Sequence, residues 1–317
     1  MAEVNSEIIH VAVAAITNSK GEVLVSQRLQ GTHLEGYWEF PGGKLEQGEA
    51  IEAALQRELQ EELGITATAY SPLIKVRHCY PEKAVLLDVW RIDAFQGQPH
   101  GLEGQPVEWR NITQLNTEDF PPADVPIISA LRLPDRYLIT GRFADASEFE
   151  HRLKRALDKG IRLVQLRLTH AWLQQNDEAA ACAIIDIAQR LCEQHSARLL
   201  LNSPEQYYAT ADSGIHLNSK QLMALTDRPE TGLLSASCHN REQLQQAEAI
   251  GADFVLLSPV QFTKSHPDAE PLGWRVFSEL VDTVNVPVYA LGGVSTSDIA
   301  QARSAGAQGV AAISALW

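Results

Sequence analysis

The sequence contains few of the residues that mark disulfide-rich, zinc-binding or membrane-spanning proteins. Only four of its 317 residues are cysteines, and none lies at the close spacing of a zinc site. Thiols this sparse are typical of a cytosolic chain, in which they stay reduced. Its apolar N-terminal stretch, Ile8 to Ile16, is too short to cross a bilayer. We therefore expect a cytoplasmic protein with no membrane partner, in which this stretch forms a buried strand.

Positive charge is scarce as well. The chain has 26 Lys and Arg side chains against 40 Asp and Glu, which gives a formal net charge of −14 at pH 7. Nucleic-acid polymers and anionic membranes bind clusters of Lys and Arg, so we expect neither as a partner. A free nucleotide whose phosphates are screened by a metal ion remains compatible with this charge.

The sequence does contain a dense group of carboxylates behind a glycine, between Gly43 and Ile65. On a helix, Glu58 and Glu62 lie about 40° apart, and Glu61 lies about 60° from Glu58. Like charges at this spacing repel one another and destabilise a bare helix. Hard carboxylate oxygens in such a group favour Mg²⁺ or Mn²⁺ as the bound ion.

The same segment has the pattern of a real helix. Ile51, Leu55, Leu59 and Leu63 recur at every fourth residue, and Gly64 follows at the position of a helix C-cap. The apolar stripe is expected to face a core, so that the carboxylates face away from it. An ordinary solvated acidic face is the alternative interpretation.

The segment resembles the Nudix box, G-x5-E-x7-R-E-U-x-E-E-x-G-U with U an aliphatic residue, at every defined position. The flanking residues are similar to MutT-type Nudix hydrolases over about residues 5 to 132, beginning with the Phe40-Pro41-Gly42-Gly43-Lys44 segment before the helix. The resemblance implies an α/β/α sandwich. It also implies hydrolysis of a nucleoside triphosphate of the 8-oxo-dGTP type to the monophosphate and pyrophosphate.

The resemblance also implies roles for particular residues. The implied metal ligands are the carbonyl of Gly42 and four glutamates, Glu58, Glu61, Glu62 and Glu103. The same glutamates are the catalytic candidates, because a bound Mg²⁺ lowers the pKa of water and a carboxylate then takes its proton. Which glutamate does so stays open. The implied substrate-binding residues are Arg28, Gly43, Lys44 and Asp124. Arg57 is expected to orient an acid such as Glu49.

Asp124 departs from the pattern of the 8-oxo-dGTP-specific relatives. In them the residue after Phe-Pro-Pro-Ala is Asn, whose amide both donates and accepts, whereas an ionised Asp only accepts. Asp124 could accept the N7 proton of an 8-oxopurine, yet it would face the O6 carbonyl without a donor unless protonated. A turn residue before Pro126 is the alternative interpretation.

Prolines concentrate between Phe120 and Pro134 and separate two parts of different pattern. We place a Nudix domain at residues 1–132 and a second domain at residues 135–317. Before the prolines, strands surround one helix, and the expected strands are Ile8–Ile16, Val23–Ser26, Ala84–Ile92 and Val107–Arg110. After them come eight short apolar runs, namely Tyr137–Thr140, Leu163–Leu166, Arg198–Leu201, Gly214–Leu217, Leu233–Ala236, Phe254–Ser258, Val286–Leu291 and Gly309–Ile313.

Helical patterns alternate with these eight runs, the clearest being Glu148–Lys159, Asp177–His195 and Arg241–Ile250. Eight βα units in about 180 residues predict a C-terminal TIM (β/α)8 barrel. An open doubly wound sheet is the structural alternative. The fold class expected for the whole chain is therefore α/β, with the α/β/α sandwich followed by the barrel.

From Tyr137 onward the chain resembles the thiamine-phosphate synthase and TenI family. Segments such as Ser258-Pro259-Val260 and Gly292-Gly293-Val294 fall at the carboxyl ends of predicted strands, where such barrels place their sites. Exposed backbone N–H groups at such turns suit a phosphate. The phosphate-binding candidates are Arg167, Thr263, Lys264, Gly292, Gly293 and Ser314.

Three positions depart from the synthase pattern. Thr169 replaces the lysine of Q-L-R-x-K, and Ser203 and Gln221 replace two metal-binding aspartates. Without those carboxylates, Mg²⁺ is not held against a pyrophosphate leaving group, so we do not expect thiamine phosphate synthesis. TenI-type members tautomerise a thiazole phosphate without metal, and His239 is the candidate acid/base. A structural histidine in an inert barrel stays open.

We therefore predict a Mg²⁺-dependent nucleoside triphosphate pyrophosphohydrolase, acting in nucleotide-pool sanitation, fused to a TenI-like barrel that binds a thiazole phosphate or a related ligand. In a second interpretation the hydrolase acts on a thiamine-related diphosphate, and both domains serve vitamin salvage. In a third, the barrel is a non-catalytic ligand sensor or an oligomerisation module, and the protein is a homo-oligomer.

Overall fold

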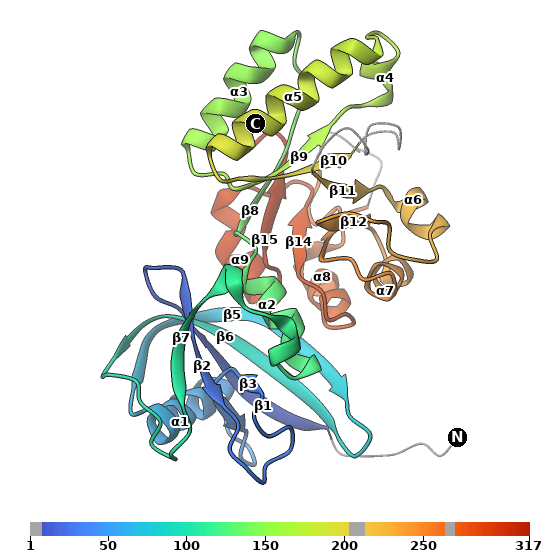
Figure 1. Ribbon diagram of the computed structural model, residues 1–317. Helices are drawn as coiled ribbons and strands as arrows, with labels where there is room; N and C mark the ends of the chain where they lie inside the picture. Colours follow the sequence, from blue (N-terminus) through green and yellow to red (C-terminus); the bar gives the residue numbers. More distant parts are fainter. Residues whose placement is uncertain (1–7, 203–212, 264–269) are drawn as a thin grey trace. The chain divides into compact units, whose positions relative to one another are not determined.

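The computed structural model describes residues 8–202, 213–263 and 270–317, and the chain forms two compact units, Met1–Arg132 and Leu133–Trp317 (Figure 1). The predictions for Ser203 and Lys264 lie outside the described residues. Across the described ranges, no helix is both long and apolar enough to cross a bilayer.

The first unit contains two β-sheets. A mixed sheet has the strand order β4-β1-β6-β5, in which β1 runs parallel to β6 and antiparallel to β4. The second sheet has the order β3-β2-β7 and is antiparallel. The strands are β1 Ile9–Ile16, β2 Glu22–Gln27, β3 Trp38–Glu39, β4 Gly42–Lys44, β5 Thr66–Cys79, β6 Ala84–Gln96 and β7 Val107–Asn111. The four strands expected from the sequence are all present.

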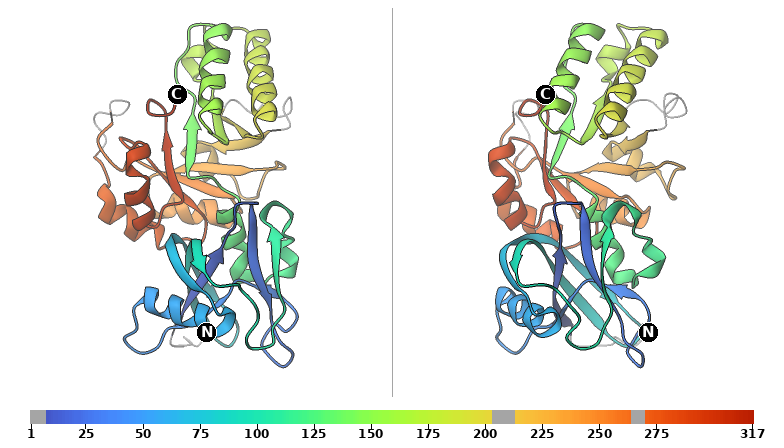
Figure 2. Two further views of the ribbon diagram at one scale, coloured as in Figure 1. Left: turned by 90° about the vertical axis from the view of Figure 1, so that its left-hand side faces the viewer. Right: turned by 60° about the vertical axis from the view of Figure 1, so that its left-hand side comes forward.

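Helices cover both faces of the strands. Along β1, Ala12 and Ala14 pack in the core that contains α1 (Ile51–Leu63), whereas Val13 packs in the core that contains α2 (Val125–Leu131). This alternation follows from the two-residue period of a strand. Figure 2 shows α1 and α2 on either side of the strands. The predicted α/β/α sandwich is confirmed.

Helix α1 forms as its apolar stripe predicts. Leu55, Leu59 and Leu63 are fully buried. The helix ends at Gly64, whose φ of 67° is a left-handed conformation that glycine adopts without steric strain. The backbone N–H of Gly64 donates to the carbonyl of Gln60 at 3.2 Å. The carboxylates of α1 therefore stay on the side away from the core.

The long strand β5 was not predicted from the sequence. Its pairing with β6 is irregular between Ala67 and Tyr70 and again between Pro72 and Ile74. Bulges and a proline break the two-residue alternation from which a strand is inferred. Strands β3 and β4 were also missed, because two or three residues are too few to show a period.

The second unit is a closed barrel of eight parallel strands in the order β10-β11-β12-β13-β14-β15-β8-β9. Each strand begins and ends within two residues of a predicted run. The strands are β8 Arg136–Ile139, β9 Leu163–Arg167, β10 Arg198–Asn202, β11 Gly214–Leu217, β12 Leu234–Cys238, β13 Phe254–Leu257, β14 Val288–Leu291 and β15 Gly309–Ala312. The predicted TIM barrel is confirmed, and the open doubly wound sheet is wrong.

The barrel has an inner and an outer core. Three buried rings from different strands, Tyr137, Phe254 and Tyr289, pack inside it with centroids 5.3 to 5.7 Å apart. Outside the strands, α3 (Ala146–Asp158) and α5 (Glu178–Gln194) run side by side, as Figures 1 and 2 show. The interior is therefore filled with side chains, and open positions are left at the ends of the strands.

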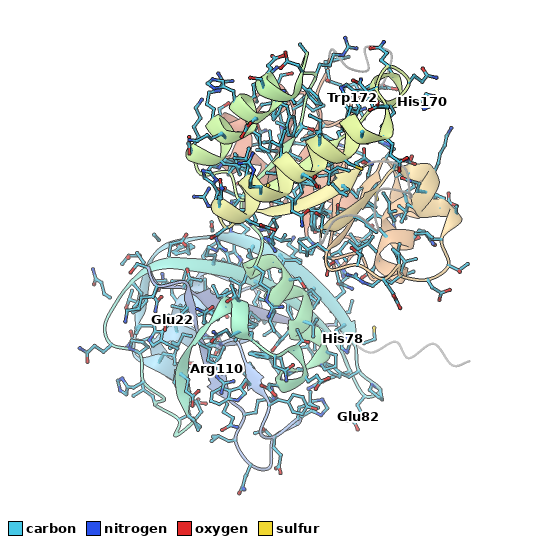
Figure 3. All side chains as sticks on the ribbon, turned by 45° about the horizontal axis from the view of Figure 1, so that its top comes forward. Glu22, His78, Glu82, Arg110, His170 and Trp172 are labelled. Atoms are coloured by element: carbon cyan, nitrogen blue, oxygen red, sulfur yellow. The ribbon has the colours of Figure 1, made fainter. Side chains whose placement is uncertain are left out.

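Shorter helices complete the barrel. They are α4 His170–Leu173, α6 Ser219–Ala224, α7 Arg241–Ala249, α8 Gly273–Val281 and α9 Ile299–Ser304. Figure 3 shows His170 and Trp172 on α4. Helices α3, α5 and α7 match their predicted bounds to within two residues. Helices α4, α6, α8 and α9 lie in the gaps between the predicted runs, where no bounds were given from the sequence.

Candidate active site

Gly42 and Gly43 at the start of β4, here called the glycine turn, lie directly against two glutamates of α1. The backbone N–H of Gly42 donates to Oε2 of Glu62 at 3.1 Å. A Cβ atom on Gly43 would lie 2.2 Å from the carboxyl carbon of Glu58, so only a glycine lets the backbone approach this carboxylate. The turn therefore brings Glu58 and Glu62 to the edge of the sheet.

Arg57 binds three carboxylates of this group. Its Nη2 atom lies 2.9 Å from Glu49, and its Nη1 atom lies 2.7 Å from Glu58 and 3.3 Å from Glu61. The Glu49 and Glu58 side chains are each 13% exposed, whereas Glu61 is 57% exposed. A planar guanidinium can fix several acceptors at once. The expected orientation of Glu49 by Arg57 is confirmed by this contact.

Glu62 lies where negative charge is concentrated. Burial raises the pKa of Glu62 to about 8, opposed by the N–H of Gly42, and the charges of Glu58, Glu39 and Glu103 raise it further. A cation at this place would replace repulsion between these carboxylates with attraction. The donor chemistry of the group therefore fits a hard divalent ion.

The glutamates are not gathered into a finished cage. Among the described residues, no three His, Cys, Asp or Glu side chains are placed to hold a metal ion. Glu61 and Glu103 are exposed. The loop that carries Glu103 is attached to the end of α1, because Leu102 N–H and the Gln105 amide donate to the Glu62 carbonyl at 2.9 and 3.1 Å. This attachment keeps Glu103 next to the charge group.

A pocket of about 240 Å³ opens beside the glycine turn. The four residues predicted to bind substrate all line it. Its polar and aromatic wall comprises Arg28, His33, Glu39, Phe40, Gly42, Gly43, Lys44, Tyr80, Lys83 and Asp124. One face of the turn therefore contacts the glutamates of α1, while the turn also forms part of the pocket.

Glu39 is a site residue that the sequence interpretation missed. It forms an ion pair with Arg28 in the wall of the pocket, and Arg28 Nε also donates to the His33 carbonyl at 2.6 Å. Burial raises the pKa of Glu39, and Arg28 opposes that shift. In the sequence, Glu39 is marked only by its position directly before Phe40. The pairing of β3 with β2 is what places Glu39 near Arg28, which follows β2.

Asp124 lines the pocket just before α2. Its residue exposure is 7%, and it lines the pocket with the short segment Pro121 to Ala123. Burial raises the pKa of Asp124 well above its ordinary range, the charge of Glu39 adds to the rise, and Arg28 opposes it. The structure thus surrounds this carboxyl with conditions that favour its neutral form.

An aromatic group forms another side of the pocket. The Tyr80 ring contacts the rings of His33 and His78 at centroid distances of 5.3 and 4.4 Å, and Lys83 lies 5.8 Å from the Tyr80 centroid. Figure 3 shows His78 near the end of β5 and Glu82 in the turn between β5 and β6. Tyr80 and Lys83 were not candidates from the sequence, because they belong to the hairpin of the unpredicted strand β5.

In the barrel, the described candidates share the carboxyl rim of the strands. Parallel strands in a closed barrel end on one side, so residues that follow them face a common region. Arg167 ends β9, His239 follows β12, Thr263 lies in the loop after β13, Gly292 and Gly293 follow β14, and Ser314 follows β15. The backbone N–H of Arg167 donates to the Thr140 hydroxyl at 2.9 Å.

The glycine pair after β14 packs tightly against the loop after β13. A Cβ atom on Gly292 would lie 2.8 Å from Pro259 Cα, and one on Gly293 would lie 2.5 Å from the Phe262 carbonyl oxygen. Their φ angles of 96° and 73° also favour glycine. Backbone packing alone therefore requires both glycines, and a side chain at Gly293 would displace the loop after β13.

His239 is placed with one ring nitrogen bound and the residue exposed. Its Nδ1 lies 2.9 Å from the Ser258 carbonyl oxygen, which can only accept, so Nδ1 carries the proton. In the neutral ring the lone pair is then on Nε2. This arrangement suits a group that takes up a proton at Nε2.

The two described departures from the synthase pattern serve helix ends. The Thr169 hydroxyl accepts from Trp172 N–H at 3.3 Å as the N-cap of α4. The Gln221 side-chain oxygen accepts from Asn218 N–H at 3.0 Å in a capping box that begins α6. A helix-capping role thus occupies the two side chains that replace the lysine and an aspartate.

His216 is a buried ionisable residue that the sequence interpretation did not single out. Its two ring nitrogens lie 2.6 Å from the Ser235 hydroxyl and 2.8 Å from the Ser237 hydroxyl. Burial lowers the pKa of His216 to about 3, and the charge of Arg167 acts in the same direction. A neutral ring donates to one hydroxyl and accepts from the other, so His216 links β11 to β12 inside the barrel.

Comparison with known proteins gives a match for each unit. Residues 136–316 match the family model described as thiamine monophosphate synthase, and residues 12–130 match the model described as NUDIX domain. The chain is 41% identical over 124 residues to an 8-oxo-dGTP diphosphatase of Escherichia coli (strain K12), covering 39% of this chain and 96% of that protein. Identity to the 8-oxo-dGTP diphosphatase of Haemophilus influenzae is 37% over 127 residues, 40% of this chain and 93% of that protein.

A thiamine-phosphate synthase of Synechococcus sp. (strain WH7803) is 31% identical over 185 residues, which cover 56% of this chain and 51% of that protein. The glycine turn, the glutamates of α1 and the closed parallel barrel are thus accompanied by sequence similarity over both units. The chain therefore belongs to the Nudix hydrolase family through its first unit and to the thiamine monophosphate synthase and TenI family through its barrel.

Proposed function

We propose that the first domain hydrolyses an oxidised purine nucleoside triphosphate of the 8-oxo-dGTP type to the monophosphate and pyrophosphate, with Mg²⁺ or Mn²⁺ as cofactor, in the cytoplasmic nucleotide pool. The names of the relatives from Escherichia coli and Haemophilus influenzae support this choice of substrate.

One observation carries the proposal: the glycine turn is shared by the charge group and the pocket. Gly42 contacts Glu62, Glu58 occupies the space beside Gly43, and both glycines line the pocket with Lys44. A nucleotide whose base enters the pocket would have its phosphates beside the glutamates. Lys44 and Lys83 add positive charge at this place, in a chain of formal net charge −14.

The residues that would hold the metal are the Gly42 carbonyl, Glu58, Glu61, Glu62 and Glu103. When bound, Mg²⁺ would neutralise phosphate charge and lower the pKa of the attacking water. The protein positions the acids: Arg57 orients Glu49 and Glu58, and the Gly42 N–H fixes Glu62. One glutamate of the group takes the proton from the attacking water, and Arg28 contacts the nucleotide.

A substrate screen of the full chain tests the proposal. With Mg²⁺ present, 8-oxo-dGTP should be hydrolysed with a higher kcat/KM than dGTP or thiamine diphosphate. Preference for thiamine diphosphate would instead support a role in vitamin salvage.

A pair of variants on α1 tests the metal site. Glu62→Gln should lower turnover by about two orders of magnitude or more, because a charged ligand is lost. Glu52→Gln is the matched control, since Glu52 is an exposed residue of the first turn of α1. Near-normal turnover in Glu62→Gln would remove Glu62 from the site.

For the barrel, we infer that the rim binds a small phosphate ester and does not make thiamine phosphate. The rim positions of Gly292, Gly293 and Ser314 support binding. The helix-capping roles of Thr169 and Gln221 support the loss of synthesis. The bound Nδ1 of His239 supports a proton transfer at Nε2, as in a tautomerase.

Calorimetry with a thiazole phosphate tests the binding. Because Gly293 also packs against Phe262, Ser314 is the better position to change. Ser314→Asp should weaken binding through charge repulsion, whereas Ser314→Asn should bind more tightly than Ser314→Asp at nearly equal side-chain size. Formation of thiamine phosphate from its precursors would contradict the inference, and binding without any turnover would favour a sensor.

A further inference from the structure

The loop of residues 97–105, here called the Glu103 loop, is attached to the carboxyl end of α1. The last four carbonyl groups of a helix have no partner inside the helix. Glu62 is the second-last residue of α1, and its carbonyl accepts from Leu102 N–H of the loop at 2.9 Å. The position of the loop is therefore tied to the end of the helix that carries the glutamates.

Gln105 makes a second connection between the loop and α1. Its side-chain Nε2 donates to the Glu62 carbonyl at 3.1 Å, and its Oε1 accepts from the Glu103 N–H at 2.9 Å. The carboxylate of Glu62 accepts from Gly42 N–H at the same time. One amide group thus joins the backbone of Glu103 to the residue of α1 that also contacts the glycine turn.

The backbone of Gln105 is held in place by the neighbouring sheet. The carbonyl of the next residue, Pro106, accepts from Gln27 N–H at 2.9 Å, and β7 then begins at Val107 and pairs with β2. The start of the loop also packs closely against Gln105, because a Cβ atom on Gly101 would lie 2.0 Å from the Gln105 carbonyl oxygen. The half-buried amide of Gln105 therefore extends from a fixed point toward the loop and the helix.

Glu103 depends on this amide more than the glutamates of α1 do. Glu103 is exposed, and among the described residues its hydrogen bond is the one from its backbone N–H to Gln105. Its charge nevertheless acts on the Glu62 carboxyl, whose pKa it helps to raise. A side chain on an unfixed loop loses conformational entropy when it binds a ligand, and this loss weakens binding. Fixing the backbone of Glu103 beforehand removes part of that cost.

We propose that Gln105 is a positioning residue of the first unit: its side-chain amide holds the backbone of Glu103 at the carboxyl end of α1, so that the Glu103 carboxylate reaches a divalent ion bound by the glutamates of the helix. This role rests on the metal-dependent hydrolysis proposed for the first domain. Loss of the amide should then act through Glu103 and not through the stability of the fold.

Calorimetric titration of the full-length chain with Mn²⁺, without nucleotide, tests this role. Gln105→Met keeps a side chain of similar length but has no amide donor or acceptor. It should raise the Kd for Mn²⁺ at least about fivefold, because Glu103 must then be ordered when the ion binds. Gln98→Met, the same substitution at an exposed residue of the Glu103 loop, is the matched control and should keep the Kd within about twofold of the wild type.

A double-mutant cycle separates positioning of Glu103 from a general effect on the fold. In a Glu103→Gln background the charged ligand is already removed, so Gln105→Met should change the Kd for Mn²⁺ by less than about twofold. The Mg²⁺ concentration that gives half-maximal hydrolysis of 8-oxo-dGTP should follow the same pattern in the wild type, the two single variants and the double variant.

Two results would overturn the proposal. An unchanged Kd in Gln105→Met would mean that the amide does not position Glu103, and an undiminished effect in the Glu103→Gln background would mean that Gln105 acts on the fold alone. Thermal melting shows whether each variant is folded, and Gln105→Ala replaces Gln105→Met if that variant melts below the assay temperature. Failure of the proposed function gives a different result, namely a wild-type chain that binds Mn²⁺ but hydrolyses neither 8-oxo-dGTP nor dGTP.

Discussion

Asp124 and His216 are both buried ionisable residues, and burial acts on them in opposite directions. Removal from water disfavours the charged form, so it raises the pKa of an acid and lowers that of a base. Asp124 is shifted upward and His216 downward, to about 3. Burial therefore favours the neutral form of both residues, one in the pocket of the first unit and one inside the barrel.

The shift of Asp124 predicts how selectivity depends on pH. Since the pKa of Asp124 is raised, its carboxyl group stays neutral at pH values where an ordinary Asp is ionised. The neutral form is lost only as pH rises through the folded-state pKa of Asp124. The ratio of kcat/KM for 8-oxo-dGTP over dGTP should therefore fall with rising pH in the wild type and not in Asp124→Asn. The catalytic steps are common to both substrates, so their pH dependence cancels in the ratio. The nucleotides ionise in the same way in assays of the wild type and of the variant. Identical pH profiles of the ratio in the two proteins would therefore contradict this prediction.

The shift of His216 predicts a stability effect at low pH. The folded-state pKa of His216 is about 3, below the ordinary 6.5. Its contribution to the free energy of unfolding is therefore complete above pH 6.5 and is lost as pH falls toward 3. Between pH 7 and pH 5 the wild type should lose about 2 kcal/mol relative to His216→Gln, from 1.36 kcal/mol per pH unit below 6.5. Denaturation of both proteins at the two pH values measures this difference, and parallel losses would show that His216 takes up protons without unfolding.

At the level of elements, the glycine turn is the start of strand β4 (Gly42–Lys44), which packs against α1. Its two glycines are required for different reasons. A Cβ on Gly42 would lie 2.1 Å from the backbone carbonyl oxygen of Ala12, whereas a Cβ on Gly43 would meet only the end of the Glu58 side chain. The first contact belongs to the fold and the second to the charge group.

The two glycines should therefore give opposite phenotypes. Gly42→Ala should lower stability by about 2 kcal/mol or more, because a rigid strand must move. Gly43→Ala should keep a melting temperature near that of the wild type but lower kcat at least about tenfold, because Glu58 is displaced from the position fixed by Arg57. Melting curves and initial rates for both variants decide this, and a stable, fully active Gly43→Ala protein would remove the contact from the mechanism.

At the level of the whole molecule, two units with separate cores carry two kinds of site. The proposed hydrolase site contains acidic residues that suit a cation. In the barrel, Thr169 and Gln221 replace residues of the synthase pattern, and both side chains cap helices. Metal dependence should therefore be confined to the first unit.

Chelation with EDTA provides the corresponding prediction. Removal of divalent ions should abolish nucleotide hydrolysis, and Mg²⁺ or Mn²⁺ should restore it. The affinity of the barrel for a thiazole phosphate, measured by calorimetry in the same EDTA buffer, should stay within about twofold of its value in Mg²⁺. A strong loss of binding in EDTA would show that the barrel also uses a metal.

The sequence by itself determined the parts that depend on local period and spacing. The apolar stripe and Gly64 define α1, the Nudix pattern identifies the glutamates, and eight apolar runs predict the barrel strands. These features are repeated along the chain, so they are visible without tertiary contacts. Strand β5 was missed because its bulges and proline remove that period.

Only the tertiary structure decided which side chains meet and in what charge state. Glu39 and Tyr80 join the pocket because β3 pairs with β2 and the β5–β6 hairpin contributes to its wall. The raised pKa of Asp124 follows from its burial and from the charge of Glu39, which no local pattern reveals. Protonation depends on solvent access and on charges brought from distant segments, and these exist only in the folded chain.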